Sequence, residues 1–412
     1  MLRPADLLSL WMILAVTPAF AENWPGWRGP RGDGSSVETD APTTWDVPGN
    51  QHIAWKTPLT YTGHSSPIVW NDRVFMTGAD EPGERRMLVA MNRRDGTVLW
   101  ERAVETSPLE KKHKLNSWAS GTPATDGERI YVAFLDKNEV RVAAYSMDGD
   151  LAWDVKPGGF SSVHGFCSCP VLYNDMVIIN GDHDGNAYLV ALDCATGTTI
   201  WKTPRENKTR SYCTPIIRDI DGRTQMILSG SKCVASYDPN NGKQWWLLDG
   251  PTEQFVASPV MNAGLVFITG GFPDKHILAI DPRGDGKITT DSHVKWRHLN
   301  KGVSYVPSPV AAGDYFFCVS DGGIASCYEA ETGKVHWQER LGPHHSSSLV
   351  AANGNVYFLD DAGTTHVIAA DKEFKIIAQN PLGEEAYSSP AISDGQIFIR
   401  GAKSLVCVGN AR

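Results

Sequence analysis

The strongest constraint on the fold of this chain is a short motif that recurs eight times. In each copy a small residue precedes a proline, which Leu349 replaces in the seventh copy, and a short apolar stretch follows. The copies are SSPIV from Ser65, GTPAT from Gly121, SCPVL from Ser168, CTPII from Cys213, ASPVM from Ala257, PSPVA from Pro307, SSLVA from Ser347 and SSPAI from Ser388. They begin about 40 to 56 residues apart, a spacing typical of repeat architectures.

Each copy continues in the same order. A turn rich in Asn, Asp and Gly is followed by an apolar strand, a third strand and a turn resembling D-x-x-T-G. A last strand carries a tryptophan at Trp100, Trp153, Trp201, Trp245, Trp296 and Trp337, with Ile377 in its place in the seventh copy. The period-two alternation and the dense turns predict a four-stranded antiparallel meander for each copy.

A single meander cannot bury both of its faces, so the tryptophans are expected to pack between neighbouring sheets. The eighth copy stops after LVCVG without a tryptophan strand, whereas HIAWKTPL, with Trp55, precedes the first copy. Pairing this N-terminal segment with the last copy would remove an open sheet edge. We therefore predict an all-β, eight-bladed β-propeller over residues 52–409, with four antiparallel strands per blade and an N-terminal strand that closes the last blade.

The first 21 residues have the features of a secretory signal peptide. Arg3 gives a positive head, Leu7 to Val16 is apolar, and Ala19-Phe20-Ala21 fits a cleavage site. We expect a periplasmic or extracellular protein after cleavage near Ala21, with an uncleaved anchor as the alternative. Residues 22–51 form a Gly/Pro-rich lead-in. No later segment reaches 18 unbroken apolar residues, so a membrane span is not expected.

The charge balance bears on the partners. Asp and Glu number 47 against 38 Lys and Arg, a net charge of −9. No basic surplus is available to neutralise phosphates, so nucleic acid is not an expected partner. We expect a monomer that binds a protein or a polysaccharide on one propeller face.

All eight cysteines lie in the mature chain, where an oxidising compartment would permit disulfides. If Gly322-Gly323 is a two-residue hairpin turn, Cys318 and Cys327 face each other within disulfide range. Two separate buried thiols are the favoured alternative. Cys167-x-Cys169 lacks the spacing of a zinc site.

Two segments resemble the pyrroloquinoline-quinone-like repeat family, whose mark is A-x-D-x-x-T-G-x-x-x-W. They are ALDCATGTTIW, which ends at Trp201, and more loosely SCYEAETGKVHW, which ends at Trp337. The resemblance covers residues from about 52 to 409 and implies an eight-bladed β-propeller. One branch of the family contains quinoprotein dehydrogenases of alcohols or sugars. Another contains non-enzymatic scaffolds, including the lipoprotein subunit of the outer-membrane β-barrel assembly machinery. The segment WPGWRGPRGDG from Trp24 is also similar to the opening of a group of secreted bacterial propellers.

This sequence departs from both branches. Many of the dehydrogenases carry an adjacent Cys-Cys pair and hold calcium and the quinone with a Glu/Asn/Asp set. The chain has no Cys-Cys pair, and no such set can be matched to its residues. Residue 22 is Glu and no cysteine lies near the cleavage point, so the lipid anchor of the scaffold subunit is not expected.

The connection that enters each innermost strand of a propeller runs near the central channel. Residues just before the repeated motif are therefore predicted to line the channel mouth. This candidate ligand-binding set is His64, His113, Asn116, His164, Tyr212, Tyr305, His344, His345 and Tyr387. Such a ring could bind a polar ligand; a hydrogen-bonded belt of loops with no ligand is the favoured alternative. No catalytic or metal-binding residue is assigned.

Two other clusters are interpreted as turns. Asp182-His183-Asp184 could bind a cation or act in acid–base catalysis, but Asp and Gly are also the residues that a solvated turn needs. The segment DPRGDGKITTDS from Asp281 has Arg283 and Ser292 where a calcium loop needs an oxygen ligand and a glutamate.

The absence of a complete catalytic motif in the sequence favours a non-catalytic binding or assembly scaffold in the bacterial envelope, with no cofactor. The alternative is an oxidoreductase of alcohols or sugars that uses pyrroloquinoline quinone with calcium. A polysaccharide-active enzyme that uses the channel mouth is a third interpretation.

Overall fold

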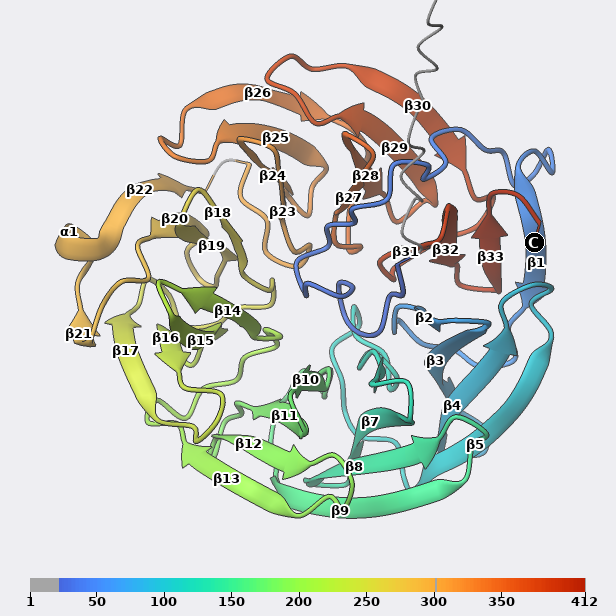
Figure 1. Cartoon of the computed structure of the whole chain (residues 1–412), viewed down its shortest axis with the longest axis horizontal. Coiled ribbons are helices and arrows are strands. Elements are labelled where there is room, and N and C mark those ends of the chain that lie inside the picture. Colours follow the sequence, from blue (N-terminus) through green and yellow to red (C-terminus); the bar gives the residue numbers. More distant parts are fainter. Residues whose placement is uncertain (1–21, 301, 412) are drawn as a thin grey trace, which may run out of the picture.

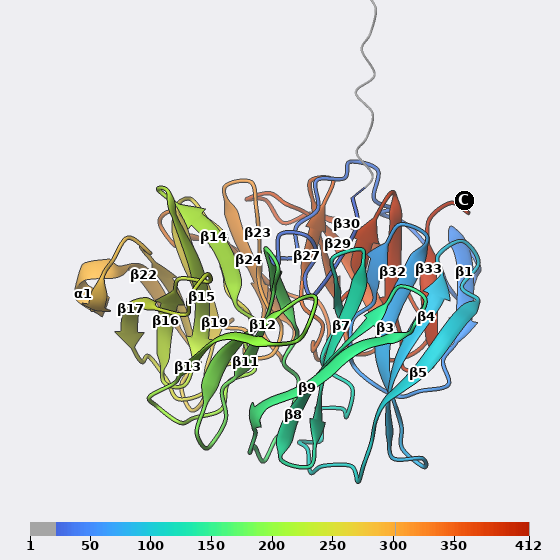
Figure 2. The ribbon, with the colours of Figure 1, turned by 60° about the horizontal axis from the view of Figure 1, so that its bottom comes forward.

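The computed structural model describes residues 22–300 and 302–411, so the proposed signal peptide lies outside the described residues. Eight antiparallel sheets stand around a central axis (Figure 1), and their strands run between the two faces of the disc (Figure 2). This arrangement confirms the predicted eight-bladed β-propeller. Within the described residues, no helix is long and apolar enough to span a membrane.

The first four blades follow the chain from the innermost strand outward. Blade 1 comprises β2 (Ile68–Trp70), β3 (Arg73–Asp80), β4 (Arg85–Asn92) and β5 (Val98–Thr106). Blade 2 comprises β6 (Ala124–Thr125), β7 (Arg129–Asp136), β8 (Glu139–Ser146) and β9 (Leu151–Gly159). Blade 3 comprises β10 (Val171–Tyr173), β11 (Met176–Gly181), β12 (Tyr188–Asp193) and β13 (Thr199–Pro204). Blade 4 comprises β14 (Ile216–Ile220), β15 (Arg223–Gly230), β16 (Cys233–Tyr237) and β17 (Gln244–Asp249).

The other four blades repeat this order. Blade 5 comprises β18 (Val260–Asn262), β19 (Leu265–Gly270), β20 (His276–Ile280) and β22 (Val294–Leu299). Blade 6 comprises β23 (Val310–Ala312), β24 (Tyr315–Val319), β25 (Ile324–Glu329) and β26 (Val335–Arg340). Blade 7 comprises β27 (Val350–Ala352), β28 (Asn355–Leu359), β29 (Thr364–Ala369) and β30 (Ile376–Pro381). Blade 8 comprises β31 (Ala391–Ser393), β32 (Gln396–Arg400), β33 (Ser404–Val408) and, as its outer strand, β1 (Ile53–Pro58).

The two ends of the chain meet in blade 8. Strand β1 pairs with β33 in an antiparallel ladder that sets Trp55 opposite Cys407. The predicted closure is therefore confirmed. It leaves the last blade with a complete set of four strands although its residues come from both ends of the sequence.

The repeated tryptophans join neighbouring blades on the outer side of the ring. The indole N–H of Trp153 in blade 2 donates to the carbonyl of Cys194 in blade 3 at 2.9 Å. Equivalent bonds to the turn before the outer strand of the next blade are made by Trp55, Trp100, Trp201, Trp296 and Trp337. We call these six contacts the outer clasps.

A glycine in the receiving turn explains the T-G pair of the repeat. Gly197 has a φ of +73°, and a Cβ added there would lie 2.6 Å from the Trp153 ring. The same close approach, also at positive φ, occurs at Gly96, Gly149, Gly242 and Gly333. Only glycine both adopts the left-handed conformation at low cost and lets the indole lie against the backbone.

The register corrects two predicted tryptophan positions. In blade 4, Trp246 rather than Trp245 pairs with the third strand at the clasp position, opposite Ser236, and Trp246 is completely buried. In blade 7, Ala378 rather than Ile377 occupies that position, opposite Val367. The β-bulge before this position recurs in the outer strand pairs of blades 1 to 7, so the strand residue that reaches the clasp position is set by its spacing from the preceding turn. A one-residue difference in that spacing moves a side chain to the other face of the sheet.

A second set of contacts joins the blades around the channel. The residue before each motif proline, or before Leu349, is Ser66, Thr122, Cys169, Thr214, Ser258, Ser308, Ser348 or Ser389. We call these eight the inner belt. In seven of the eight successive pairs, all within the described chain, the backbone N–H of one member donates to the side chain of the next. The small residue of the motif is therefore a hydrogen-bond acceptor as well as a compact side chain.

The segment DPRGDGKITTDS forms an insertion in blade 5. It contains β21 (Gly286–Ile288) and the one-turn helix α1 (Thr290–His293). Strand β21 pairs in parallel with β17 of blade 4, and Asp281 bonds to Arg283 and Lys295. The insertion links blades 4 and 5 through backbone hydrogen bonds. At this junction Trp246 does not form an outer clasp.

Cys318 and Cys327 do not form a disulfide, and the favoured alternative of two separate buried thiols is confirmed. The turn between β24 and β25 is longer than two residues, and Cys318 pairs with Ser326 whereas Cys327 pairs with Phe317. The one-residue offset places the two thiols on opposite faces of the sheet, in different core clusters. All eight cysteines are free thiols in this structure.

The lead-in closes one end of the channel. It crosses the centre of the ring, as the blue segment of Figure 1 shows, and contacts seven blades. The Trp24 backbone pairs with Val69, and buried Arg28 donates to the carbonyl of Ser308 at 3.2 Å. Burial lowers the pKa of Arg28 to about 10, against the opposing effect of Asp33. The side chain bonds to three backbone carbonyls and stays charged at neutral pH.

Candidate functional site

The face opposite the lead-in contains a cavity of about 580 Å³ at the channel mouth. This volume is typical of small-molecule sites. The lining includes eight of the nine predicted residues: His64, His113, Asn116, His164, Tyr212, Tyr305, His344 and Tyr387. The loops that enter successive inner strands bring them together, because each motif proline begins a strand beside the axis. Their role in ligand binding stays a prediction.

His345 is the exception, because it lies behind the wall. Its side chain is fully buried, and neither imidazole nitrogen has a hydrogen-bond partner in the structure. The ring lies 6.5 Å from that of His366, which itself contacts Asp360. Burial lowers the pKa of His345 to about 4, so the imidazole is neutral at physiological pH. Neighbouring residues in a loop commonly point in opposite directions, and here only His344 faces the cavity.

The floor of the cavity comes from the lead-in and the inner belt. Trp27 lines the cavity, and its indole N–H donates to Oγ of Ser258 at 3.2 Å. Six belt residues also reach the lining: Cys169, Thr214, Ser258, Ser308, Ser348 and Ser389. Trp27 is not among the residues predicted for the site. The W-x-x-W-R-G signature was visible, but nothing in the sequence placed a lead-in residue inside the channel.

One wall carries a connected polar network. Nδ1 of His164 lies 3.1 Å from the Tyr212 hydroxyl and 3.2 Å from Nε of Arg210. Arg210 also donates to Gln254, whose amide donates to the Tyr305 hydroxyl at 2.5 Å. Burial lowers the pKa of His164, and the positive charge of Arg210 acts in the same direction. The imidazole of His164 is therefore neutral at pH 7.

The opposite wall contains an Asp–His pair. Nδ1 of His344 lies 2.5 Å from a carboxylate oxygen of Asp361. The same carboxylate accepts bonds from the backbone N–H and the hydroxyl of Ser346, at 2.7 and 3.0 Å. Because a carboxylate is an acceptor, Nδ1 carries the proton, and Nε2 of a neutral His344 is left as an acceptor.

Asp321 lies beside this wall, and its carboxylate is already hydrogen-bonded and ion-paired. Its carboxylate accepts bonds from the backbone N–H groups of Tyr305 and Val306, both at 3.1 Å. Nζ of Lys275 approaches it at 3.2 Å. Asp321 therefore holds the Tyr305 loop in place rather than presenting a free carboxylate.

His64 and Tyr387 form the third part of the lining. Their rings lie 4.9 Å apart, tilted by 36°. Burial lowers the pKa of His64 to about 4, and the positive charges of Arg400 and Lys112 contribute. The Tyr387 hydroxyl donates to Glu385 at 2.9 Å. The imidazole is a neutral hydrogen-bonding group packed against an aromatic face.

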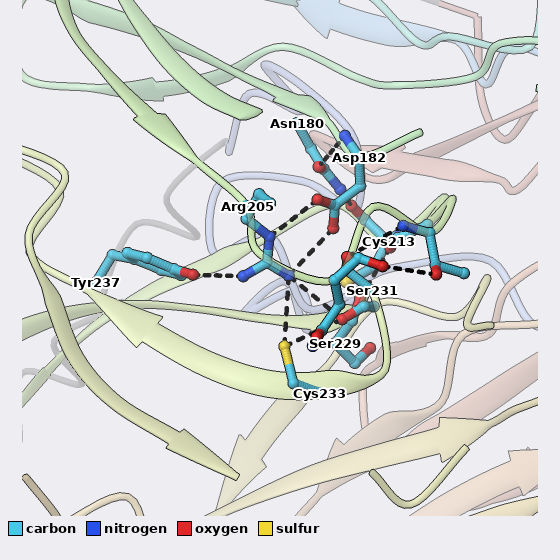
Figure 3. Close-up of polar contacts among 12 residues, drawn as sticks. Asn180, Asp182, Arg205, Cys213, Ser229, Ser231, Cys233 and Tyr237 are labelled. Atoms are coloured by element: carbon cyan, nitrogen blue, oxygen red, sulfur yellow. Dashed lines mark hydrogen bonds and ion pairs between the residues drawn. The ribbon is translucent and has the colours of Figure 1, made fainter. Parts of the chain in front are cut away.

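A buried ion pair that was not predicted from the sequence supports the His164 wall. Asp182, interpreted as part of a solvated turn, is completely buried and accepts two bonds from Arg205, at 2.9 and 3.1 Å (Figure 3). Burial alone would lower the pKa of Arg205, but Asp182 reverses the direction, and the pKa lies above its ordinary value. Arg205 also donates to Tyr237 and to the carbonyl of Gly230.

The pair ties the β11–β12 loop, which carries Asp182 and Asp184, to the β13–β14 loop, from which Arg210 and Tyr212 extend. Asp184, at the other end of the Asp-His-Asp cluster, binds Arg210 through both oxygens, at 2.8 and 2.7 Å. Arg205 and Arg210 lie more than 20 residues after the cluster in sequence, so no local motif indicates that they pair with it. The cluster is thus structural on both sides of His183, which is itself buried.

The cavity does not present the donors that calcium and a quinone require. Hard cations such as calcium take six to eight oxygen ligands, mostly carboxylates and carbonyls. The carboxylate on the cavity lining, Asp321, is already held by two amides and a lysine. No group of three or more His, Cys, Asp or Glu side chains within the described residues could hold a metal ion. The residues present therefore do not fit a calcium–quinone pair.

Known proteins share this architecture. The family model described as outer membrane protein assembly factor BamB matches residues 49–115, 84–272 and 273–374. No curated protein matches the sequence. Among solved structures, BamB from Moraxella catarrhalis is 13% identical with a TM-score of 0.62, over 86% of this chain and 98% of its own.

Two quinohemoprotein alcohol dehydrogenases are also similar in structure. The enzyme from Comamonas testosteroni is 13% identical with a TM-score of 0.66, over 95% of this chain and 81% of its own. ADHIIG from Pseudomonas putida HK5 is 12% identical with a TM-score of 0.64, over 94% and 80%. At these identities the likeness shows the fold alone, and the same fold carries both BamB and dehydrogenases. Since the family model matches most of the chain, the protein belongs to the BamB family of pyrroloquinoline-quinone-like repeat β-propellers.

Proposed function

We propose that this protein is a non-catalytic binding scaffold of the bacterial envelope, exported by its N-terminal segment, which takes up its ligand at the channel mouth. The family match and the structural likeness to BamB support a scaffold, and the one-ended cavity supports a discrete ligand.

A single observation carries the proposal: the charged groups of the cavity are committed to holding its loops. Arg210 is paired with Asp184, and Asp321 with Lys275 and two amides. A catalytic acid, base or metal ligand needs a group that is free to change its bonding during a reaction. A lining whose charged groups are used in this way favours binding over turnover.

The experiment separates a scaffold from a quinone enzyme. The purified chain is incubated with pyrroloquinoline quinone and either calcium or a lanthanide, and dye-linked oxidation of alcohols and sugars is measured. We expect no turnover above the protein-free control. Oxidation that needs both quinone and metal, and that falls in a Tyr387→Ala variant, would replace the scaffold proposal with an oxidoreductase.

Location is tested separately. Expression of the full chain in a Gram-negative host, followed by fractionation, should give a periplasmic product that lacks the first 21 residues. A cytoplasmic product of full length would contradict the envelope assignment.

A further inference from the structure

The chemistry of the channel-mouth cavity indicates the class of ligand it takes. Charge is the first criterion. Of the side chains that line the cavity within the described residues, Arg210 and Asp321 carry a full charge at neutral pH, and each is paired with an opposite charge of the protein. An ionic ligand would compete with these pairs or lose its hydration without a counter-charge, which is costly. A neutral ligand meets neither cost.

Hydrogen-bonding capacity is the second criterion. Nε2 of His344 is left as an acceptor by the Asp361 contact, and the Tyr305 hydroxyl, which accepts from Gln254, still has its own proton to donate. The lining also includes Asn116, whose side-chain NH2 donates one bond to the carbonyl of His164 and has a second N–H, and Ser346, whose hydroxyl donates to Asp361 and can still accept. Donors and acceptors are interspersed around the cavity. This suits hydroxyl groups, each of which donates one bond and accepts two.

Aromatic surface is the third criterion. Trp27 lies at the floor, Tyr387 packs against His64 with the rings tilted by 36°, and Phe272 stands at the mouth with 59% of its surface exposed. An aromatic face carries partial negative charge and attracts the weakly positive C–H groups of a saturated ring. A pyranose ring combines hydroxyl groups on its edge with C–H groups on its faces.

The shape of the cavity supplies the last step. The lead-in closes the channel below Trp27, so a ligand enters from the mouth and stops at the floor. A blind cavity of about 580 Å³ accepts the end of a chain rather than its middle. We infer that the channel-mouth cavity binds the terminal units of a neutral oligosaccharide. The inference rests on the proposed function, since it names the ligand class of that same site.

Titration calorimetry on the purified chain tests the inference. The probes are neutral cello-, xylo-, manno- and chito-oligosaccharides, with uronic-acid oligosaccharides and an extended peptide of similar length as the other classes. We expect at least one neutral series to bind with a dissociation constant in the micromolar to low millimolar range. Binding should weaken at least tenfold in Tyr387→Ala and His344→Gln, and remain unchanged in Tyr173→Ala, a tyrosine substitution at the β10–β11 turn on the face opposite the mouth.

The outcomes distinguish the two proposals. If only uronic-acid oligosaccharides or the peptide bind, and the two cavity variants weaken that binding, the neutral-saccharide inference is overturned while the binding scaffold stands. Binding of any probe that both cavity variants leave intact would remove the channel mouth as the site and so overturn both proposals. If no neutral series binds, the inference fails. Circular dichroism spectra that match the parent chain show that each variant is folded.

Discussion

The outer and inner contacts between blades differ in where they are interrupted. The outer clasps occur at six of the eight junctions of the described ring and are missing between blades 4 and 5 and between blades 7 and 8. The inner belt continues through both of these junctions, by bonds from Thr214 to Ser258 and from Ser348 to Ser389. The inner belt is interrupted instead between blades 3 and 4, where the Trp201 clasp is present, so the two systems together span all eight junctions of the described ring.

The missing clasps have a common cause. A clasp needs a short turn before the outer strand of the next blade, and neither junction offers one. Blade 5 carries the β21–α1 insertion there, and the outer strand of blade 8 is β1, which no turn connects to β33. At blade 7, Trp45 of the lead-in packs near the empty position, stacked on Tyr357 at 6.5 Å. Trp246 of blade 4, which occupies the clasp position without such a turn, donates to Gln225 of its own blade instead.

The largest expected effect comes from breaking a clasp. Trp153→Ala removes a large side chain and its bond to Cys194, and such truncations cost about 3–5 kcal/mol. Ile377→Ala, at the position that the sequence assigned to blade 7, should cost less than about 1 kcal/mol because the side chain is 39% exposed. Urea unfolding measures both. Equal losses would contradict the assignment of the clasp.

Adjacent tryptophans in blade 4 test the register. Trp246 is completely buried and donates to Gln225 at 2.8 Å, whereas Trp245 is partly buried and packs near Arg223. We expect Trp246→Ala to cost at least about 3 kcal/mol and Trp245→Ala about 1 kcal/mol. The same unfolding measurement ranks them. The reverse ranking would restore the position predicted from the repeat.

Alanine substitutions at two glycines distinguish the cost of the left-handed backbone conformation from the cost of disturbing the clasp. Gly197→Ala forces a left-handed alanine and a Cβ against Trp153, so about 2–3 kcal/mol is expected. Gly354→Ala, at a φ of +67° with open space around it, should cost only about 1 kcal/mol. Thermal unfolding of the two variants gives the difference. If the losses are the same, the indole contact contributes nothing beyond the turn conformation.

A pH titration probes the inner side of the ring. The pKa of buried His345 is lowered from 6.5 to about 4, so the unfolded chain binds more protons than the folded chain between these values. The groups that face it are Asp360, His366, His344 and Asp321. Stability should therefore fall as the pH drops from 6.5 to 4, by on the order of 1–3 kcal/mol. In His345→Phe, the free energy of unfolding measured in urea should differ less between pH 4.5 and pH 7 than in the parent chain. An unchanged difference would mean that other groups cause the pH dependence.

The smallest effect is expected in the inner belt. Ser348→Ala leaves the buried N–H of Ser308 without its acceptor and should cost about 1 kcal/mol. Cys169→Ser replaces a weak thiol acceptor by a hydroxyl for the N–H of Thr122 and should gain up to about 1 kcal/mol. Thermal unfolding compares them. A loss in both variants would show that packing at these positions matters more than the acceptor.

The candidate site was predictable in outline. Eight of the nine residues proposed for the channel mouth line the cavity, because the motif proline fixes where each loop reaches the axis. Trp27 was missed because a lead-in residue reaches the site from outside the repeats. The Asp182–Arg205 pair was missed because the partners lie on different loops and only their burial reveals the contact.

The repeated pattern by itself determined the number of blades, the four-stranded meander and the closure by β1, because alternation, turn residues and the missing last strand are all local or countable. Only the tertiary structure decided the register at the bulges, the face on which each cysteine lies, and the path of the lead-in across the channel. These depend on one-residue shifts and on contacts between segments up to hundreds of residues apart. Such contacts are chosen by packing and burial, which no single stretch of sequence contains.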